Sequence, residues 1–214
     1  MPSYISEVLP GIKYTVIVTV AAFAIGAGLG VPLALMRRSA RRAPRALSAS
    51  VVNLIRSIPP ITWLFVIFYG LPSVRITLSA VPAAIVGLGV IAGAYLSEIY
   101  RSGLLAVSKG QWEASRALGF NDRDTLVHVI GPQASRVIGP SAATYAIGLL
   151  KDSAVASTIG VTEITFRANS AQTVSGHAIA LFVTAGAIYL LLSLPLAVVS
   201  RNVDRRLRAR YSLV

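Results

Sequence analysis

Three ionisable residues stand within or beside long apolar stretches of this sequence: Arg56, Glu98 and Asp152, the last followed by Ser153. A charge in such surroundings is costly, so a functional role is the default hypothesis for each of them. Carboxylates pair with cations and a guanidinium pairs with carboxylates, so these residue types suit the binding of a small charged ligand. Each also has a structural alternative: an ion pair of Glu98 with Arg101 three residues along a helix, extension of Arg56 to the membrane surface, and a packing role for Asp152.

Other kinds of chemistry find little support in the sequence. Ser175 and His177 are two residues apart, do not face each other on a helix, and lie in no G-x-S-x-G motif. We therefore expect no hydrolase. The chain has no cysteine and only two isolated histidines, so we expect no metal site. No P-loop occurs, so a nucleotide would have to be bound by a partner, and we expect no cofactor here.

The composition indicates a membrane protein. Of the 214 residues, 55% are hydrophobic and 13% are charged, and the mean hydropathy is +0.70; a soluble domain of this size carries more charge. The net charge of +12 would suggest nucleic acid in a soluble protein, but in a membrane protein it is typical of basic cytoplasmic loops. The first apolar stretch lacks a basic start and a clear cleavage site, so we interpret it as a retained span.

The apolar stretches predict five membrane-spanning helices in a single domain, residues 1–214, with spans at about 14–36, 57–74, 76–97, 136–150 and 178–199. Pro59 and Pro60 predict a kinked or irregular second span. Gly26, Gly28 and Gly30 allow close approach of a neighbouring helix, or are incidental. Basic clusters follow spans one, three and five, which predicts an N-terminus outside and a cytoplasmic C-terminus.

Between the third and fourth spans lies a polar stretch that predicts a helical elbow at about 108–131. Ser108 and Gln111 match a capping box, Gly119 can end a first helix in the left-handed conformation, and Asn121 can cap a second. Pro132 predicts that this second helix bends or stops at the preceding glycine. Trp112, Ala117, Leu118 and Phe120 supply an apolar face. An elbow of this kind favours docking of a soluble partner; a membrane-anchored DNA-binding helix–turn–helix is the alternative, and the acidic residues of the elbow speak against it.

The same residues carry a resemblance. Glu113-Ala114-Ser115, then Gly119, then nine residues to Val129-Ile130-Gly131-Pro132 is similar to the "EAA" loop of ABC-type import permeases, E-A-A-x-x-x-G followed by I-x-L-P. Ser115 replaces the second alanine, Val129 the isoleucine and Gly131 the leucine. The segments Asn53–Pro60, Phe68–Pro72, Gly93–Gly103, Leu149–Gly160 and Glu163–Thr165 resemble segments of the polar amino-acid (histidine, glutamine or arginine type) permeases, so the likeness covers most of residues 53–169.

This resemblance implies an all-α type I ABC importer fold and a non-catalytic permease subunit in a bacterial plasma (inner) membrane. The implied partners are an ABC ATPase dimer that binds ATP, a second permease, identical or paralogous, an external solute-binding protein, membrane lipid and a polar amino acid, with no nucleic acid. It implies ATPase coupling by Glu113, Ala114, Ser115, Leu118, Gly119 and Pro132. The candidates for the substrate path are Arg56, Glu98, Asp152 and Ser153, which lie inside the segments that carry the resemblance. An importer of another small solute and a passive channel remain as alternatives.

Overall fold

The computed structural model describes residues 4–209, and every regular element within this range is helical. The α-helices are α1 (Tyr4–Val8), α2 (Ile12–Arg37), α3 (Arg42–Ser57), α4 (Pro60–Phe65), α5 (Ala80–Leu105), α6 (Lys109–Ala117), α7 (Asp122–Asp124), α8 (Gly131–Asp152), α9 (Ile164–Ser175) and α10 (Ala178–Ala209). Tighter 3₁₀ turns cover Leu9–Gly11, Leu71–Val74 and Ser153–Ile159, and wider π-helical turns cover Val66–Gly70 and Thr125–Ile130. The prediction of an all-α chain is confirmed over the described residues.

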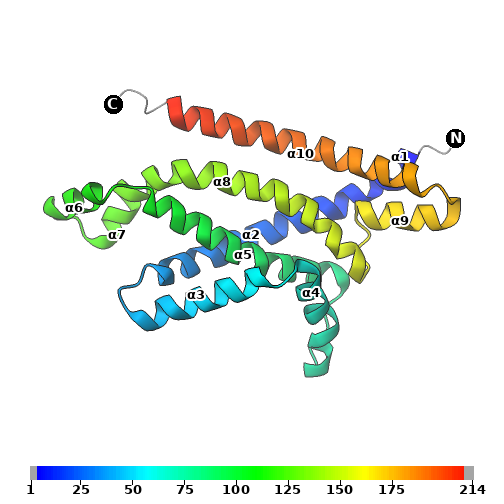
Figure 1. The fold of residues 1–214 in the computed structure, drawn as a ribbon, viewed down its shortest axis with the longest axis horizontal. Coiled ribbons are helices and arrows are strands. Elements are labelled where there is room, and N and C mark those ends of the chain that lie inside the picture. The colour runs from blue at the N-terminus through cyan, green and yellow to red at the C-terminus, as the bar shows by residue number, and fades with distance from the viewer. Residues whose placement is uncertain (1–3, 210–214) are drawn as a thin grey trace.

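The long helices run along one common direction, with short helices at both ends (Figure 1). At one end lie α6 and α7, the connection between α2 and α3, and the last turns of α10; at the opposite end lie α1 and α9 (Figure 1). Consequently the basic stretch 37–45, the basic residues of the elbow and the backbone of the basic tail as far as Ala209 all belong to the same end of the molecule.

The helices α2 and α5 form the most extensive helix pair of the described chain, and small residues let their backbones approach. A β-carbon on Gly26 would overlap the Cβ of Ala92, and one on Gly93 would lie 2.9 Å from the Cβ of Leu29. Gly28, in contrast, faces open space. The expected close approach of a neighbouring helix is therefore confirmed, and α5 makes it on the face of α2 that carries Gly26.

Three helical stretches are long and apolar enough to cross a membrane: Tyr4–Arg37, Ala80–Leu105 and Ala178–Val198. These overlap the expected first, third and fifth spans. The fourth expected span, 136–150, lies inside α8, which begins earlier, at Gly131, and ends at Asp152. The third expected span was placed too early, because α5 starts after the extended residue Ser79 and continues to Leu105.

The expected second span, 57–74, is not one helix. Ser57 is the last residue of α3, an amphipathic helix that the sequence reading did not include, and the chain turns by 100° before the stretch Pro60–Val74. Ile58 and Pro59 adopt extended backbone between the two parts, because a residue before proline is excluded from helical geometry. The second part projects away from the other helices (Figure 1).

Candidate functional site

The elbow begins as expected and is capped differently. The helix α6 starts at Lys109, but the side chain of Ser108 makes no capping hydrogen bond. Instead the backbone N–H of Gln111 donates to the Ser108 carbonyl at 3.1 Å, and the Gln111 side chain accepts from Nε2 of Gln133 at 3.1 Å. The prediction of a capping box is therefore wrong, because Gln111 reaches across to α8 rather than back to its own helix start.

The turn between α6 and α7 follows the prediction. Gly119 has φ +82°, and the N–H groups of Gly119 and Phe120 donate to the carbonyls of Arg116 and Ser115 at 3.0 and 3.1 Å. This pairing is a Schellman motif, which satisfies carbonyls at the end of a helix. Asn121 then caps α7 by accepting from the Asp124 N–H at 2.8 Å, so both turn predictions are confirmed.

The second helix of the elbow does not stop at the proline. Gly131 keeps right-handed helical angles, φ −57° and ψ −49°, and α8 continues from it through Pro132. The π-helical turn Thr125–Ile130 directly precedes it. In a π-helical turn carbonyls accept from N–H groups five residues later and not four, so the N–H that proline lacks is not needed there. The result is a continuous connection from the elbow into α8.

The underside of the elbow packs on the long helices. Ile130 and Ala134 are fully buried against Leu104 and Val107 at the end of α5. Ser115 is also buried, and its hydroxyl donates to the Gln111 carbonyl at 2.8 Å. Because these contacts join the elbow to both α5 and α8, a displacement of the elbow is felt by two of the long helices.

The outer face of the elbow is open. The side chain of Leu118 is 77% exposed and that of Phe120 is 40% exposed, and Glu113, Ala114 and Pro132 are exposed as well. Trp112 was expected on the same apolar face, and this expectation is wrong: it is half-buried against the Leu104 cluster.

Trp112 has a cationic neighbour from another helix. The Arg38 guanidinium lies over its ring, 4.2 Å from the centroid. Partial burial lowers the pKa of Arg38 from its ordinary value, and an arginine still stays charged at neutral pH. The contact joins the end of α2 to α6.

Of the residues considered for the substrate path, Glu98 is already occupied. One carboxylate oxygen pairs with Arg37 of α2 at 2.8 Å, and the other pairs with Arg101 at 2.8 Å. The expected ion pair with Arg101 is present, and the arginine from α2 adds a second one that sequence spacing does not reveal. Glu98 therefore ties α2 to α5 and offers little to a ligand.

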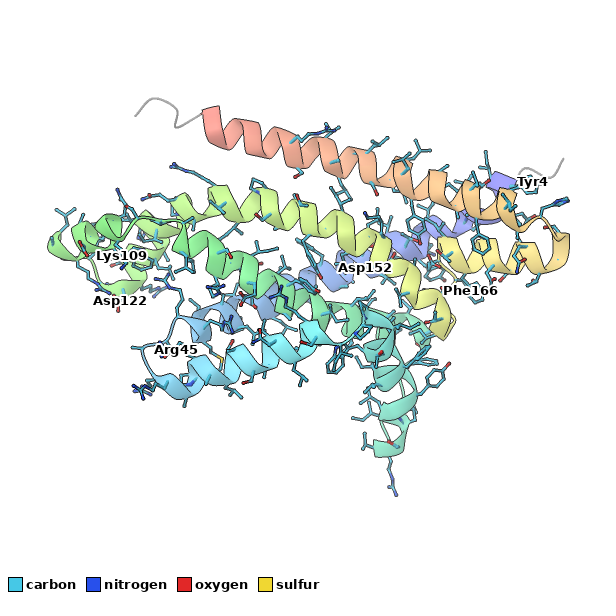
Figure 2. All side chains as sticks on the ribbon, in the orientation of Figure 1. Tyr4, Arg45, Lys109, Asp122, Asp152 and Phe166 are labelled. Atoms are coloured by element: carbon cyan, nitrogen blue, oxygen red, sulfur yellow. The ribbon has the colours of Figure 1, made fainter. Side chains whose placement is uncertain are left out.

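Arg56 lies at one end of a pair of stacked tyrosines, and Asp152 lies on the helix that carries the second tyrosine. The Arg56 guanidinium is 4.9 Å from the ring centroid of Tyr95, and Tyr95 stacks on Tyr145 with centroids 5.4 Å apart. Asp152 is the last residue of α8 and lies about two helical turns after Tyr145 on the same helix. Arg56 and Asp152 are exposed while both rings are half-buried. Figure 2 shows Asp152 between the end with Lys109 and the end with Tyr4.

The tyrosines were missed by sequence reasoning. A signal was present: Tyr145 and Asp152 are seven residues apart and share a face of one helix, and Tyr95 lies in a segment singled out for other residues. Ser153, in contrast, is fully buried and its hydroxyl donates to the Leu150 carbonyl at 2.7 Å. It is thus not placed with Asp152 on the open face.

Ser175 and His177, the pair considered for hydrolysis, do not form a catalytic arrangement. His177 follows α9 and packs edge-on against Tyr4, with ring centroids 5.9 Å apart, while the Ser175 hydroxyl donates to the Ala171 carbonyl at 2.9 Å. Among the residues whose side chains the structure describes, no group of three or more histidine or acidic side chains could hold a metal ion.

The described chain thus combines apolar helices long enough to cross a membrane with an elbow whose outer face is open. The family is shown by sequence: a model of the binding-protein-dependent transport system inner membrane components matches residues 6–209. The chain belongs to this family.

Curated relatives agree. The L-cystine transport system permease protein TcyB of Bacillus subtilis (strain 168) is 37% identical over 201 residues, 92% of this chain and 85% of that protein. The arginine transport system permease protein ArtQ of the same organism is 31% identical over 203 residues, 94% of this chain and 93% of that protein.

Solved structures show the same fold. The chain matches an amino acid ABC transporter crystallised with histidines at a TM-score of 0.88 and 31% identity, covering 95% of both chains. It also matches the inward-facing MetNI methionine ABC transporter at a TM-score of 0.81 and 21% identity, covering 97% of this chain and 99% of that one. The second match bears on the fold alone.

Proposed function

We propose that this chain is the permease subunit of an ATP-driven importer of polar amino acids in a bacterial inner membrane. The observation that carries the substrate class is the pair of stacked tyrosines, with Arg56 over the Tyr95 ring and Asp152 about two turns along α8 from Tyr145. An amino acid brings a carboxylate and an ammonium group, which need a cationic and an anionic partner. In this proposal Arg56 receives the carboxylate, Asp152 receives the ammonium group, and Tyr95 and Tyr145 lie alongside the ligand. Relatives named for cystine and arginine transport support this class.

The proposed topology has five spans in one domain, with the N-terminus outside and the C-terminus cytoplasmic. Two of these spans need partners. The stretch Pro60–Val74 exposes large apolar side chains, among them Val66, Tyr69 and Val74 at 54%, 62% and 64%. The helix α8 is not among the described stretches that are apolar enough to cross a membrane alone. A second permease subunit, identical or paralogous, would cover such surfaces and enclose a path for a polar solute.

The proposed coupling surface is the outer face of the elbow, comprising Glu113, Ala114, Leu118 and Gly119, with Pro132 beside it. Ser115 belongs to the elbow through its buried underside rather than its outer face. An ATPase dimer would dock here and move α5 and α8 through the packing at Ile130. An external solute-binding protein would deliver the amino acid at the opposite end.

The proposal is tested by purifying the chain with its ATPase and binding protein and measuring uptake into vesicles. We expect uptake of a polar amino acid, and none of sugars or phosphate. We also expect a mass of two permeases per two ATPases. Uptake of another solute class overturns the substrate assignment, and a mass with one permease per two ATPases overturns the dimer.

The ligand contact is tested by Asp152→Asn. Loss of a charged hydrogen bond to the ammonium group should lower uptake affinity roughly 10- to 100-fold, while assembly and basal ATPase activity persist. Lys151→Gln is the matched control, because it removes the adjacent exposed charge and should leave affinity unchanged. Wild-type affinity in Asp152→Asn would remove Asp152 from the substrate site.

A further inference from the structure

Two adjoining cavities lie where α2 and α5 meet the elbow. The first, of about 370 Å³, is lined by charged and aromatic side chains, among them Arg38, Lys109, Trp112, Glu113 and Arg116. The second, of about 310 Å³, is lined by apolar side chains and the ring of a tyrosine, including Val31, Leu35, Tyr100, Leu126 and Ile138. Leu104 lines both, so the two cavities adjoin at this side chain.

The first cavity carries an excess of positive charge. Its three cations, Arg38, Lys109 and Arg116, face one carboxylate, that of Glu113. Within the described part of the chain, neither Arg38 nor Lys109 has an acidic group within 4.0 Å, and Arg116 meets Asp122 only at 3.7 Å where both are exposed. Arg38 is held in place by its contact with the Trp112 ring. The cavity is therefore suited to an anion.

The second cavity suits a hydrocarbon chain. It runs along the last turns of α2, next to the basic stretch that follows Arg37. Leu35 and Val31 are 47% and 48% exposed, so the groove is open along its outer side. A basic pocket that adjoins an apolar groove at the end of membrane-spanning helices matches the two chemical parts of an anionic phospholipid.

We propose that the two cavities together bind one anionic phospholipid, with its phosphate among Arg38, Lys109 and Arg116 and an acyl chain in the groove beyond Leu104. Guanidinium and ammonium groups are the usual donors to phosphate oxygens. A bound lipid connects the end of α2 to α6, so the position of the elbow depends on the anionic lipid content of the membrane. This inference rests on the proposed function only for assigning the site to the cytoplasmic leaflet.

Trp112 lies in the first cavity and serves as the probe. The full chain with its ATPase, in detergent micelles, is titrated with phosphatidylglycerol or phosphatidylcholine carrying brominated acyl chains, which quench nearby tryptophan. The emission of Trp112 is obtained by subtracting the emission of the Trp112→Phe variant from that of the unchanged protein. We expect the anionic lipid to quench at lower concentration than the zwitterionic one.

The charge of the pocket is then removed with Arg38→Gln and Lys109→Gln together. The preference for phosphatidylglycerol should fall roughly 30-fold, from the loss of two basic contacts. The matched control is Arg41→Gln with Arg45→Gln, which removes two exposed charges from the same end of the molecule outside the cavity. Lys109→Arg should keep the preference.

Two results overturn the proposal. Equal quenching by both lipids would mean that Trp112 meets only the unspecific lipid that surrounds any membrane protein, and not a lipid bound in the two cavities. Loss of the preference in the Arg41 and Arg45 control shows attraction by the basic surface in general. Both readouts measure lipid binding and need no transport, so failure here is distinct from failure of the proposed import function.

Discussion

The short helices at the two ends of the molecule are held in opposite ways. At one end, α9 is fixed by buried polar contacts: Glu163 is fully buried, accepts from the Phe166 N–H at 2.7 Å, and accepts from the Tyr189 hydroxyl of α10. Ile164 donates its N–H to the Thr15 hydroxyl of α2 at 3.4 Å. At the other end, α6 buries one of its nine residues, Ser115.

This difference indicates which of the two ends can move relative to the long helices. A helix tied to two neighbouring helices by buried groups keeps its place, because each unsatisfied group would be costly. A helix that rests on one apolar cluster and exposes its outer face can move with a partner that grips it. The elbow has the second character, which supports its proposed role as the coupling element. Three predictions compare matched positions at the two ends.

The largest effect is expected from Glu163→Ala. The change removes the cap of α9 and leaves the Tyr189 hydroxyl without its acceptor, so stability should fall by roughly 2–4 kcal/mol. The melting temperature of the purified chain in detergent measures it. Glu113→Ala on the elbow is the control, because that carboxylate is exposed and should leave melting unchanged. Equal melting temperatures of the two variants would contradict the proposed difference in stability between the two ends.

Much of the elbow could be predicted from the sequence because its turns obey local rules. Gly119 ends α6 and Asn121 caps α7, since left-handed geometry and capping depend on a few adjacent residues. The capping box at Ser108 was wrong because a long-range contact to Gln133 competed for Gln111. Local rules predict what neighbours in the chain decide, and fail where a distant helix offers another partner.

Contacts between distant helices could not be predicted from the sequence, because local rules do not show which helices meet. The stack of Tyr95 on Tyr145 joins α5 to α8, and the pairing of Glu98 with Arg37 joins α5 to α2. Neither spacing carries a periodic signal. The apolar pattern predicted the second span as one stretch, because hydropathy measures composition and not direction. The 100° bend arises where extended backbone precedes Pro60.

An intermediate effect is expected from Gly119→Val, and its matched control is Gly176→Val. Both glycines end a short helix with positive φ, +82° and +73°, in open space. A valine side chain in this conformation should cost each variant about 1–2 kcal/mol. Melting should therefore fall equally. Only Gly119→Val should also weaken ATPase attachment or uncouple hydrolysis from uptake, because only that turn lies on the proposed docking face.

The outcome separates two roles of Gly119. Normal substrate-stimulated ATPase activity and normal uptake in Gly119→Val would leave the glycine as a helix terminator only. Uncoupling in both variants would mean that any strained turn disturbs transport, and the proposed distinction between the ends would be lost.

The smallest effect on the fold is expected from Leu118→Ser. This side chain is 77% exposed, so stability should change by no more than about 0.5 kcal/mol. An apolar anchor at the centre of an interface contributes more than its neighbours, so ATPase affinity should fall roughly tenfold. Val174→Ser is the counterpart at the other end, because Val174 of α9 is 90% exposed.

Affinity for the ATPase, measured by titrating the labelled ATPase onto the permease, decides between exposure and docking. If exposure alone made Leu118 important, both serine variants would behave alike. We expect Val174→Ser to bind the ATPase as the unchanged chain does, and only Leu118→Ser to release it. A Leu118→Ser chain that keeps full ATPase affinity would move the docking surface away from Leu118 and leave Glu113 and Ala114 as its remaining candidates on α6.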